Sequence, residues 1–253
     1  MSPRITLAVA ARVLTQLRRD HRTMAMLVVL PCLVLTLLWW MFEGSAGGAG
    51  GFDTLGPPLL ALIPFVVMFL VTSVTTLRER SSGTLERLLA MPTGKGDFLS
   101  GYALAFGLVA AVQSVLAVAL CHWVLGLDVA GPVSMLVVVA VVDAVLGTAL
   151  GLLVSAFART EFQAVQFMPA LVIPQILLCG LFVPREAMPR VLEAVSDVLP
   201  LSYAVDAMTS VSSMTGSGFG GVDAGVWTDI VVVLTFAVAG LALGAATLRR
   251  RTA

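Results

Sequence analysis

Long apolar runs separated by short polar segments make up most of this chain. Six of the runs reach the roughly 20 residues that an α-helix needs to cross a bilayer core of about 30 Å. We therefore expect an all-α integral membrane protein with six transmembrane helices. The expected spans are residues 24–42, 55–77, 98–125, 132–157, 164–183 and 227–248.

Composition agrees with this pattern. The chain has 253 residues, of which 58% are hydrophobic and only 12% are charged, and its mean hydropathy is +1.00. Soluble domains contain about 25% charged residues, so the class of soluble globular proteins is excluded. Cys32, Cys121 and Cys179 all lie in apolar runs and lack the spacing of a metal or disulfide motif. We expect them to be small core residues.

The distribution of basic residues predicts the orientation of the spans. Lys and Arg gather in cytoplasmic loops of membrane proteins. With a cytoplasmic N-terminus, thirteen of the fifteen basic residues lie inside, and only Arg185 and Arg190 lie outside. Both termini are then cytoplasmic, in a multi-pass protein of the cell membrane. The thirteen are Arg4, Arg12, Arg18, Arg19, Arg22, Arg78, Arg80, Arg87, Lys95, Arg159, Arg249, Arg250 and Arg251.

Two segments outside the spans have helical patterns of their own. In residues 1–23, apolar residues interleave with arginines, which predicts an amphipathic helix on the cytoplasmic face. The outer segment 184–226 is far longer than a turn requires, so we expect it to be structured. Its apolar positions between Met188 and Leu199 predict a short helix, either at the outer membrane interface or as a plain surface helix.

The cytoplasmic segment 78–97, RERSSGTLERLLAMPTGKGD, is one of the few dense charge clusters. Gly83 can cap a short helix from Thr84 to about Met91, and Glu86 can bond back to that cap. Leu85, Leu88 and Leu89 fall on one face. A helix this short is unstable alone in water, so we expect it to dock in the groove of a partner.

The same segment resembles a known motif. ERSSGTLERLLAMP is similar to the E-R-x-x-G-T-x-E-x-L-x-x-x-P segment of type-2 ABC transporter permeases, the ABCG-like exporter class and specifically the daunorubicin-resistance type. The resemblance implies one type-2 ABC transmembrane domain over residues 1–253, with 78–97 as the coupling-helix loop that contacts an ATPase subunit. The residues it assigns to coupling, with their apolar and charged neighbours, are Glu79, Arg80, Gly83, Thr84, Leu85, Glu86, Arg87, Leu88 and Leu89.

A second segment supports the resemblance. LPLSYAVDAM, residues 199–208, is similar to the P-L-x-Y-x-x-D/E-x-M/L-R segment before the last span of the same family. Pro200, Leu201, Tyr203 and Asp206 match it. Thr209 stands where the family usually has arginine, so a role carried by that arginine does not transfer to this chain.

The resemblance also implies partners. No G-x-x-x-x-G-K-[ST] motif occurs, so the chain has no P-loop for ATP and is not an enzyme by itself. By likeness to the family, two copies of a separate P-loop ATPase bind the ATP and magnesium and assemble with two permease chains, identical or different. We expect no cofactor, metal or catalytic residue on this chain, contact with membrane lipid, and no nucleic acid partner.

Asp143 and Gln113 are polar residues within expected spans. Asp143 is near the middle of the fourth span, where a carboxylate costs about 2.5–3.5 kcal/mol on insertion scales. Together with Gln113 of the third span it either lines a route for polar or cationic substrate or locks helices together. Gly147 with Gly151, and Gly240 with Gly244, predict close helix packing. Prolines inside spans predict kinks at Pro31, Pro64, Pro169 and Pro174.

Function is expected to be export of a hydrophobic or amphipathic substrate, with a drug or antibiotic favoured. Lipid or polysaccharide export by a related permease is the alternative. An ion-driven carrier is more distant, because such proteins usually carry several charges in the membrane and repeated halves. An intramembrane enzyme is disfavoured, since neither H-E-x-x-H nor G-x-S-x-G occurs.

Overall fold

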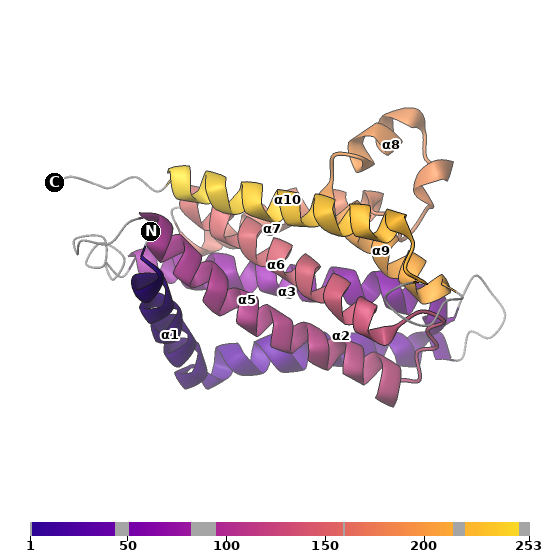
Figure 1. The fold of residues 1–253 in the computed structure, drawn as a ribbon, viewed down its shortest axis with the longest axis horizontal. Coiled ribbons are helices and arrows are strands. Elements are labelled where there is room, and N and C mark those ends of the chain that lie inside the picture. Colours follow the sequence, from indigo (N-terminus) through magenta and orange to yellow (C-terminus); the bar gives the residue numbers. More distant parts are fainter. Residues whose placement is uncertain (1, 44–50, 82–94, 159, 215–220, 248–253) are drawn as a thin grey trace.

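The computed structural model describes residues 2–43, 51–81, 95–158, 160–214 and 221–247. Within these ranges the secondary structure is entirely helical, as expected (Figure 1). The predicted coupling helix, residues 84–91, lies outside them. The helices are α1 (Pro3–Arg19), α2 (His21–Glu43), α3 (Phe52–Ser81), α5 (Lys95–Ala119), the π-helix η1 (Leu120–Val124), α6 (Val133–Phe157), α7 (Glu161–Leu178), the 3-10 helix η2 (Arg185–Ala187), α8 (Arg190–Ser196), α9 (Pro200–Ser213) and α10 (Ala224–Thr247).

Six of these helices are long and apolar enough to cross a membrane, which confirms the predicted span number. They are α2, α3, α5 continued by η1, α6, α7 and α10. The N-terminus and the last residues of α10 lie at one end of the bundle, and α8 lies at the other (Figure 1). We call these the terminal end and the α8 end.

The helix α7 has different bounds from those expected for the fifth span. α7 begins at Glu161 rather than at residue 164, because the Thr160 side chain caps it by accepting a hydrogen bond from the Gln163 N–H at 3.1 Å. It stops at Leu178 rather than at residue 183. Gly180 has a φ of +94°, a left-handed conformation that ends the helix and turns the chain.

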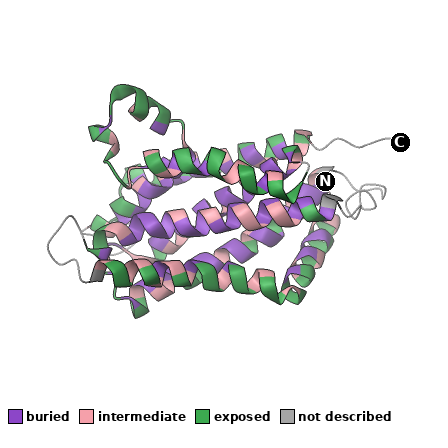
Figure 2. Ribbon diagram, turned by 180° about the vertical axis from the view of Figure 1, so that it is seen from behind, coloured by how far each residue is buried: buried purple, intermediate pink, exposed green. Residues whose placement is uncertain are grey.

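The core of the bundle is formed by α3 and α6, which lie side by side with most of their residues buried (Figure 2). Glycines allow this approach. A Cβ on Gly147 would lie 2.4 Å from the Phe65 carbonyl oxygen, and one on Gly151 would lie 2.6 Å from that of Phe69. The first G-x-x-x-G pair therefore packs within one chain, and Gly240 and Gly244 likewise lie against α6.

The predicted amphipathic helix is present as α1, and its apolar face packs against the bundle. Val9, Ala10, Val13 and Leu17 are buried, and α1 packs along the start of α5. A Cβ on Gly101 of α5 would lie 2.7 Å from Val9.

The boundary between α1 and the first span also differs from the prediction. α2 begins at His21, three residues earlier than expected. Asp20 forms the corner between the two helices: its carboxylate accepts hydrogen bonds from the Thr23 N–H at 3.2 Å and from the Thr23 hydroxyl at 2.7 Å. These bonds are the main reason why the pKa of Asp20 is lowered below its ordinary value.

The long segment before the last span is structured, as expected, but besides η2 its described residues form two α-helices, α8 and α9. α8 lies within the predicted range 188–199, and its apolar side chains Val191, Leu192 and Val195 are exposed. The second helix, α9, returns into the bundle and packs against α3, α6 and α10. Only the first of them was predicted.

Candidate functional site

Two ion pairs fix the terminal end of α3, where the segment 78–97 begins. Glu79 is buried, and its carboxylate lies 4.0 Å from the Arg12 guanidinium of α1. Gln16 of α1 lies beside it as well. Next to it, Arg78 donates two hydrogen bonds to Glu161 of α7, at 3.1 and 3.2 Å. Two adjacent residues of α3 thus form ion pairs with two other helices, α1 and α7.

Most of the residues assigned to coupling lie outside the described part of the chain. They are Gly83, Thr84, Leu85, Glu86, Arg87, Leu88 and Leu89. Arg80 is within α3, but its side chain is likewise not described. Of the residues assigned to coupling, the structure therefore describes a contact only for Glu79, which pairs with Arg12 of α1. The coupling assignment itself stays a prediction.

A hollow of about 500 Å³ lies on α1 beside this contact. Its lining residues include Ala11, Arg12, Thr15, Gln16 and Arg19. Spacings of three and four residues place these side chains along one face of the helix. The terminal end thus presents two arginines and two hydrogen-bonding side chains at one place.

Asp143 and Gln113 are buried in the interior of the bundle. Asp143 is 0% exposed and Gln113 is 1% exposed. No carboxylate or amide atom of these two side chains has a hydrogen-bond partner within the described residues. The Ser114 hydroxyl donates to the Ala140 carbonyl oxygen at 3.0 Å, so α5 and α6 meet at this depth. Asp143 is one helical turn further along α6, about 4.5 Å of rise away.

In this arrangement Asp143 faces protein. It does not bring Asp143 and Gln113 into a hydrogen bond with each other. An ionised carboxylate without a partner is costly in apolar surroundings. The contribution of these residues to a substrate route stays a prediction.

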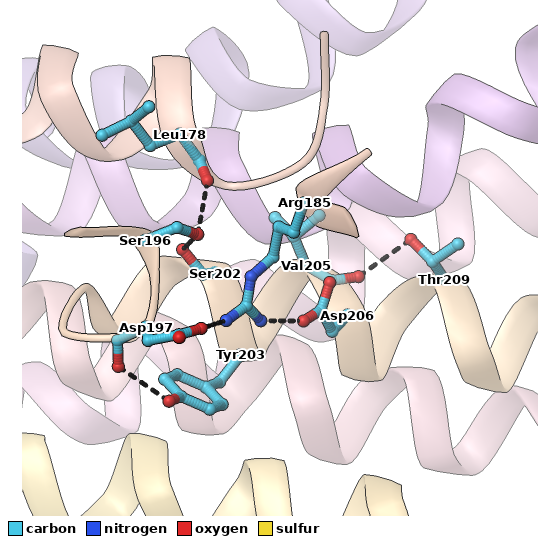
Figure 3. Close-up of polar contacts among 9 residues, drawn as sticks. All are labelled: Leu178, Arg185, Ser196, Asp197, Ser202, Tyr203, Val205, Asp206 and Thr209. Carbon is cyan, nitrogen blue, oxygen red and sulfur yellow. Dashed lines mark hydrogen bonds and ion pairs between the residues drawn. The ribbon is translucent and has the colours of Figure 1, made fainter. Parts of the chain in front are cut away.

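At the α8 end, two residues of the second motif, Tyr203 and Asp206, contact one arginine, Arg185 (Figure 3). Its guanidinium group is hydrogen-bonded to the carboxylates of Asp206 and Asp197. The ring of Tyr203 lies under it, 5.2 Å from ring centroid to guanidinium carbon. The Tyr203 hydroxyl donates to the Asp197 carbonyl oxygen at 2.7 Å. Arg185 comes from η2, Asp197 ends α8, and the other two residues come from α9.

The other two motif residues position α9. Pro200 is its first residue, where proline's missing N–H costs no hydrogen bond. Leu201 is fully buried, and its N–H lies 3.4 Å from the side-chain oxygen of Gln175 in α7. The neighbouring Ser196 hydroxyl donates to the Leu178 carbonyl oxygen at 2.7 Å. The motif thus joins α7, α8 and α9.

Partial burial and the contact between the two groups shift the pKa values of Arg185 and Asp206. Burial alone would lower the pKa of the Arg185 guanidinium, but Asp206 and Asp197 outweigh it and the pKa is raised. Burial raises the pKa of the Asp206 carboxyl, and Arg185 acts against that rise. Thr209, at the position where the resemblance expects arginine, is exposed, and its hydroxyl donates to the Val205 carbonyl oxygen of its own helix. The cation beside Asp206 therefore comes from η2 instead.

Sequence reasoning missed Arg185 as a site residue. The available signal was its place as one of only two basic residues in the expected outer segments. Nothing in the spacing along the chain links Arg185 to Asp206, which lies 21 residues further on. Their pairing depends on how the segment between α7 and α9 folds back.

Comparison with known proteins places the chain in a family. The model of the ABC-2 type transporter family matches residues 5–212. "Probable multidrug ABC transporter permease YbhR" of Escherichia coli K12 is 30% identical over 150 residues, which cover 59% of this chain and 41% of that protein. "Linearmycin resistance permease protein LnrN" of Bacillus subtilis 168 is 26% identical over 166 residues, 65% of this chain and 43% of that protein.

A eukaryotic protein is similar as well. "ABC transporter G family member 20" of Dictyostelium discoideum is 26% identical over 186 residues, 74% of this chain and 25% of that protein. The matched regions span less than half the length of each of these relatives. The family match, by contrast, extends from α1 to α9 and includes both motifs found in the sequence. The chain belongs to the ABC-2 type transporter family.

Proposed function

We propose that this chain is the membrane subunit of an ATP-driven exporter, which moves a hydrophobic or amphipathic substrate outward. Membership of the ABC-2 type family over residues 5–212 is the observation that carries the proposal. Two copies of a separate P-loop ATPase supply the energy and bind ATP and magnesium. The chain itself contains no P-loop motif.

The proposed orientation puts the terminal end in the cytoplasm. Thirteen of fifteen basic residues belong to segments on that side, and two belong to the other. The α8 end, with Arg185 and its acidic partners, then faces outward. The chain would be a multi-pass protein of the cell membrane.

The ion pairs at the end of α3 suggest how movement would pass from the ATPase to the spans. The segment 78–97 continues directly from Arg78 and Glu79. Glu79 forms an ion pair with α1, and Arg78 forms one with α7. A push on the segment would displace α3 together with both helices, and α3 is packed against α6 through Gly147. Three spans and the N-terminal helix would then respond as one body.

A drug or antibiotic is the substrate class that the relatives favour, since two of them are named for multidrug transport and for linearmycin resistance. Asp143 and Gln113 are proposed to lie near the substrate route. Lipid or polysaccharide export is the alternative within the family. An ion-driven carrier is the more distant alternative, and dependence on an ion gradient rather than on ATP would identify it.

The test is affinity purification of the tagged chain from membranes solubilised in mild detergents, with mass spectrometry of the proteins retained. We expect a P-loop ATPase with the native chain, and its loss from a Glu86→Arg, Leu89→Asp variant. Arg190→Glu is the matched control, because it also reverses a charge, that of an exposed residue at the α8 end. Retention of the ATPase by the Glu86, Leu89 variant would contradict the docking site. Absence of any ATPase would contradict the exporter.

A further inference from the structure

The corner between α1 and α2 joins basic side chains to an apolar helix face. α1 lies across the terminal end of the bundle, and α2 runs from the end of α1 toward the α8 end (Figure 1). Arg19 is the last residue of α1, and Arg22 is in the first turn of α2. Both are exposed, and neither forms an ion pair within the described part of the chain. Their guanidinium groups are thus available to an anion at this corner.

α2 presents an apolar face that begins at the same corner. In its most apolar window only 17% of residues are buried, against 67% in α3. Its exposed leucines and methionine recur at intervals of four, three and four residues, which places them in one stripe: Met26, Leu30, Leu33 and Leu37. Arg22 lies four residues before Met26, at the terminal end of this stripe. From Ala25 to Met41 every exposed residue of α2 is apolar. Acyl chains suit such a face, because hydrocarbon offers no hydrogen bonds to polar groups.

The hollow on α1 reaches the corner as well. Its lining residues include Arg12, Thr15, Gln16 and Arg19, so Arg19 belongs to both features. Its volume of about 500 Å³ is many times the roughly 30 Å³ that one water molecule occupies. Nη1 of Arg12 is buried and has no hydrogen-bond partner within the described residues. The hollow therefore has room for a polar head group and donors to bind it.

The charge around the corner is positive. Residues 11–23 contain four arginines and one acidic residue, Asp20. The Asp20 carboxylate accepts hydrogen bonds from the N–H and the hydroxyl of Thr23. Clusters of basic residues at a membrane surface attract anionic lipids. A guanidinium group also fits a phosphate, which it binds through two parallel hydrogen bonds.

We infer that an anionic phospholipid binds at this corner. Its phosphate lies between Arg19 and Arg22, the rest of its head group enters the hollow on α1, and an acyl chain lies along the Met26 to Leu37 stripe of α2. A soluble phosphate matches only the basic half of this site. A zwitterionic lipid matches the stripe but brings a cation of its own to the arginines. The inference does not depend on the proposed export function.

Lipid retention by the purified chain tests the site. Native mass spectrometry in mild detergent counts the lipid molecules that stay bound when phosphatidylglycerol or phosphatidylcholine is added. We expect the native chain to retain several-fold more phosphatidylglycerol than phosphatidylcholine. Arg19→Gln combined with Arg22→Gln should remove this preference, because both cations are lost while the apolar stripe remains. An equal preference in the native chain and the double variant would overturn the inference.

The matched control is Arg4→Gln combined with Arg190→Gln. Both residues are exposed; Arg4 lies near the start of α1, and Arg190 lies at the α8 end. The two double variants have the same net charge, so a difference between them depends on position. The control should keep the preference of the native chain. If it loses as much as the Arg19, Arg22 variant, net charge alone attracts the lipid and the site is disproved.

The apolar half of the site has its own test. Glycerol 3-phosphate carries the phosphate without acyl chains, so at equal concentration it should not displace phosphatidylglycerol. Displacement would assign the corner to a soluble anion. Leu33→Ser should lower phosphatidylglycerol retention, whereas Leu243→Ser, a similarly exposed position on α10, should not. Equal losses in these two variants would contradict an acyl chain on α2.

Thermal unfolding gives a second measurement. The substituted side chains are exposed, so without added lipid each variant should unfold at the temperature of the native chain. Added phosphatidylglycerol should raise the unfolding temperature of the native chain, because a ligand that binds the folded state stabilises it. It should not do so in the Arg19, Arg22 variant, and an equal rise there would count against the site. Neither measurement requires an ATPase, so this inference and the proposed function can fail separately.

Discussion

The guanidinium group of Arg185 is paired with the carboxylate of Asp206, 21 residues further along the chain (Figure 3). Asp206 is part of the motif shared with the family, and Arg185 is not. The pair fastens the segment between α7 and α9 to the buried helix α9. At a bundle end where α8 exposes its apolar side chains, this is the charged contact that holds the segment in place.

Replacing Arg185 should release that segment. In Arg185→Ala, Asp206 and Asp197 lose their shared cation, and a buried charge without its partner costs several kcal/mol, about 3–5 when fully buried and less here because Asp197 is largely exposed. We expect faster hydrogen exchange in residues 184–199, measured by mass spectrometry in detergent. Arg190→Ala, an exposed arginine five residues away, is the control and should leave exchange unchanged.

A cation at position 209 should replace Arg185 in part. Thr209 is exposed and one turn beyond Asp206 on α9, a spacing at which oppositely charged side chains meet. Thr209→Arg in the Arg185→Ala background should therefore slow exchange again near Asp206, while Thr209→Gln should not. Equal effects of the two substitutions would mean that the charge of Arg185 is not what matters.

The corner between α1 and α2 should loosen at low pH. Hydrogen bonds from Thr23 lower the pKa of Asp20, so its ionised form stabilises the folded state. The contribution is complete above the ordinary aspartate value of about 4 and is lost as the pH falls through the lower folded value. Asp20→Ala should remove it at all pH values, at a cost of about 1 kcal/mol for a lost helix cap.

Hydrogen exchange of the residues around this corner between about pH 6 and pH 3 measures the effect. Asp20→Asn separates the cap from the charge, since the amide oxygen still caps the helix but does not titrate. We expect the native corner to become less protected below the ordinary aspartate pKa and the Asn variant to show no such transition. A transition of equal size in both would assign the effect to another group.

The contact between α3 and α6 should not tolerate a methyl group at Gly147. An added Cβ would lie 2.4 Å from the Phe65 carbonyl oxygen, a backbone atom that cannot move without shifting its helix. Gly147→Ala should therefore overpack the core and lower the free energy of unfolding by about 1–3 kcal/mol. Thermal unfolding of the purified protein measures this loss. Gly107→Ala on α5, where the nearest atom is 3.8 Å away, should be neutral or slightly stabilising.

Asp143 provides a prediction about substrate charge. Asp143→Asn keeps the size of the buried side chain but removes its ability to ionise. If Asp143 lies on the substrate route, the variant should export cationic substrates less well and neutral ones normally, measured as efflux from cells. Equal loss for both classes would assign Asp143 to helix packing alone.

The hydrophobic pattern by itself determined the number of spans, because each apolar run of about 20 residues can satisfy its backbone in a bilayer only as a helix. It also predicted α1 and a helix in the segment 184–226. The pattern did not fix the helix ends. α7 stops at Leu178 within an apolar run, because Gly180 adopts a left-handed conformation that hydropathy does not report.

α9 was missed although its signal was present. Leu201, Ala204, Val205 and Met208 follow the helical spacing of three and four residues and are buried. The helix is only 14 residues long, too short for a span, so a search for spans passes over it. Its place inside the bundle is a property of the folded chain, since only packing against α3, α6 and α10 decides that a short apolar helix is buried.

The candidate site divides in the same way. Motif spacing in the sequence identified Tyr203 and Asp206, because those residues lie within one short segment. The tertiary structure alone decided that Arg185 completes this cluster and that Arg12 contacts Glu79 across 67 residues of sequence. A local sequence pattern indicates which face of its own helix a residue occupies. A contact between distant residues depends on how the helices pack, and that packing is the sum of many small side-chain contacts that no single motif contains.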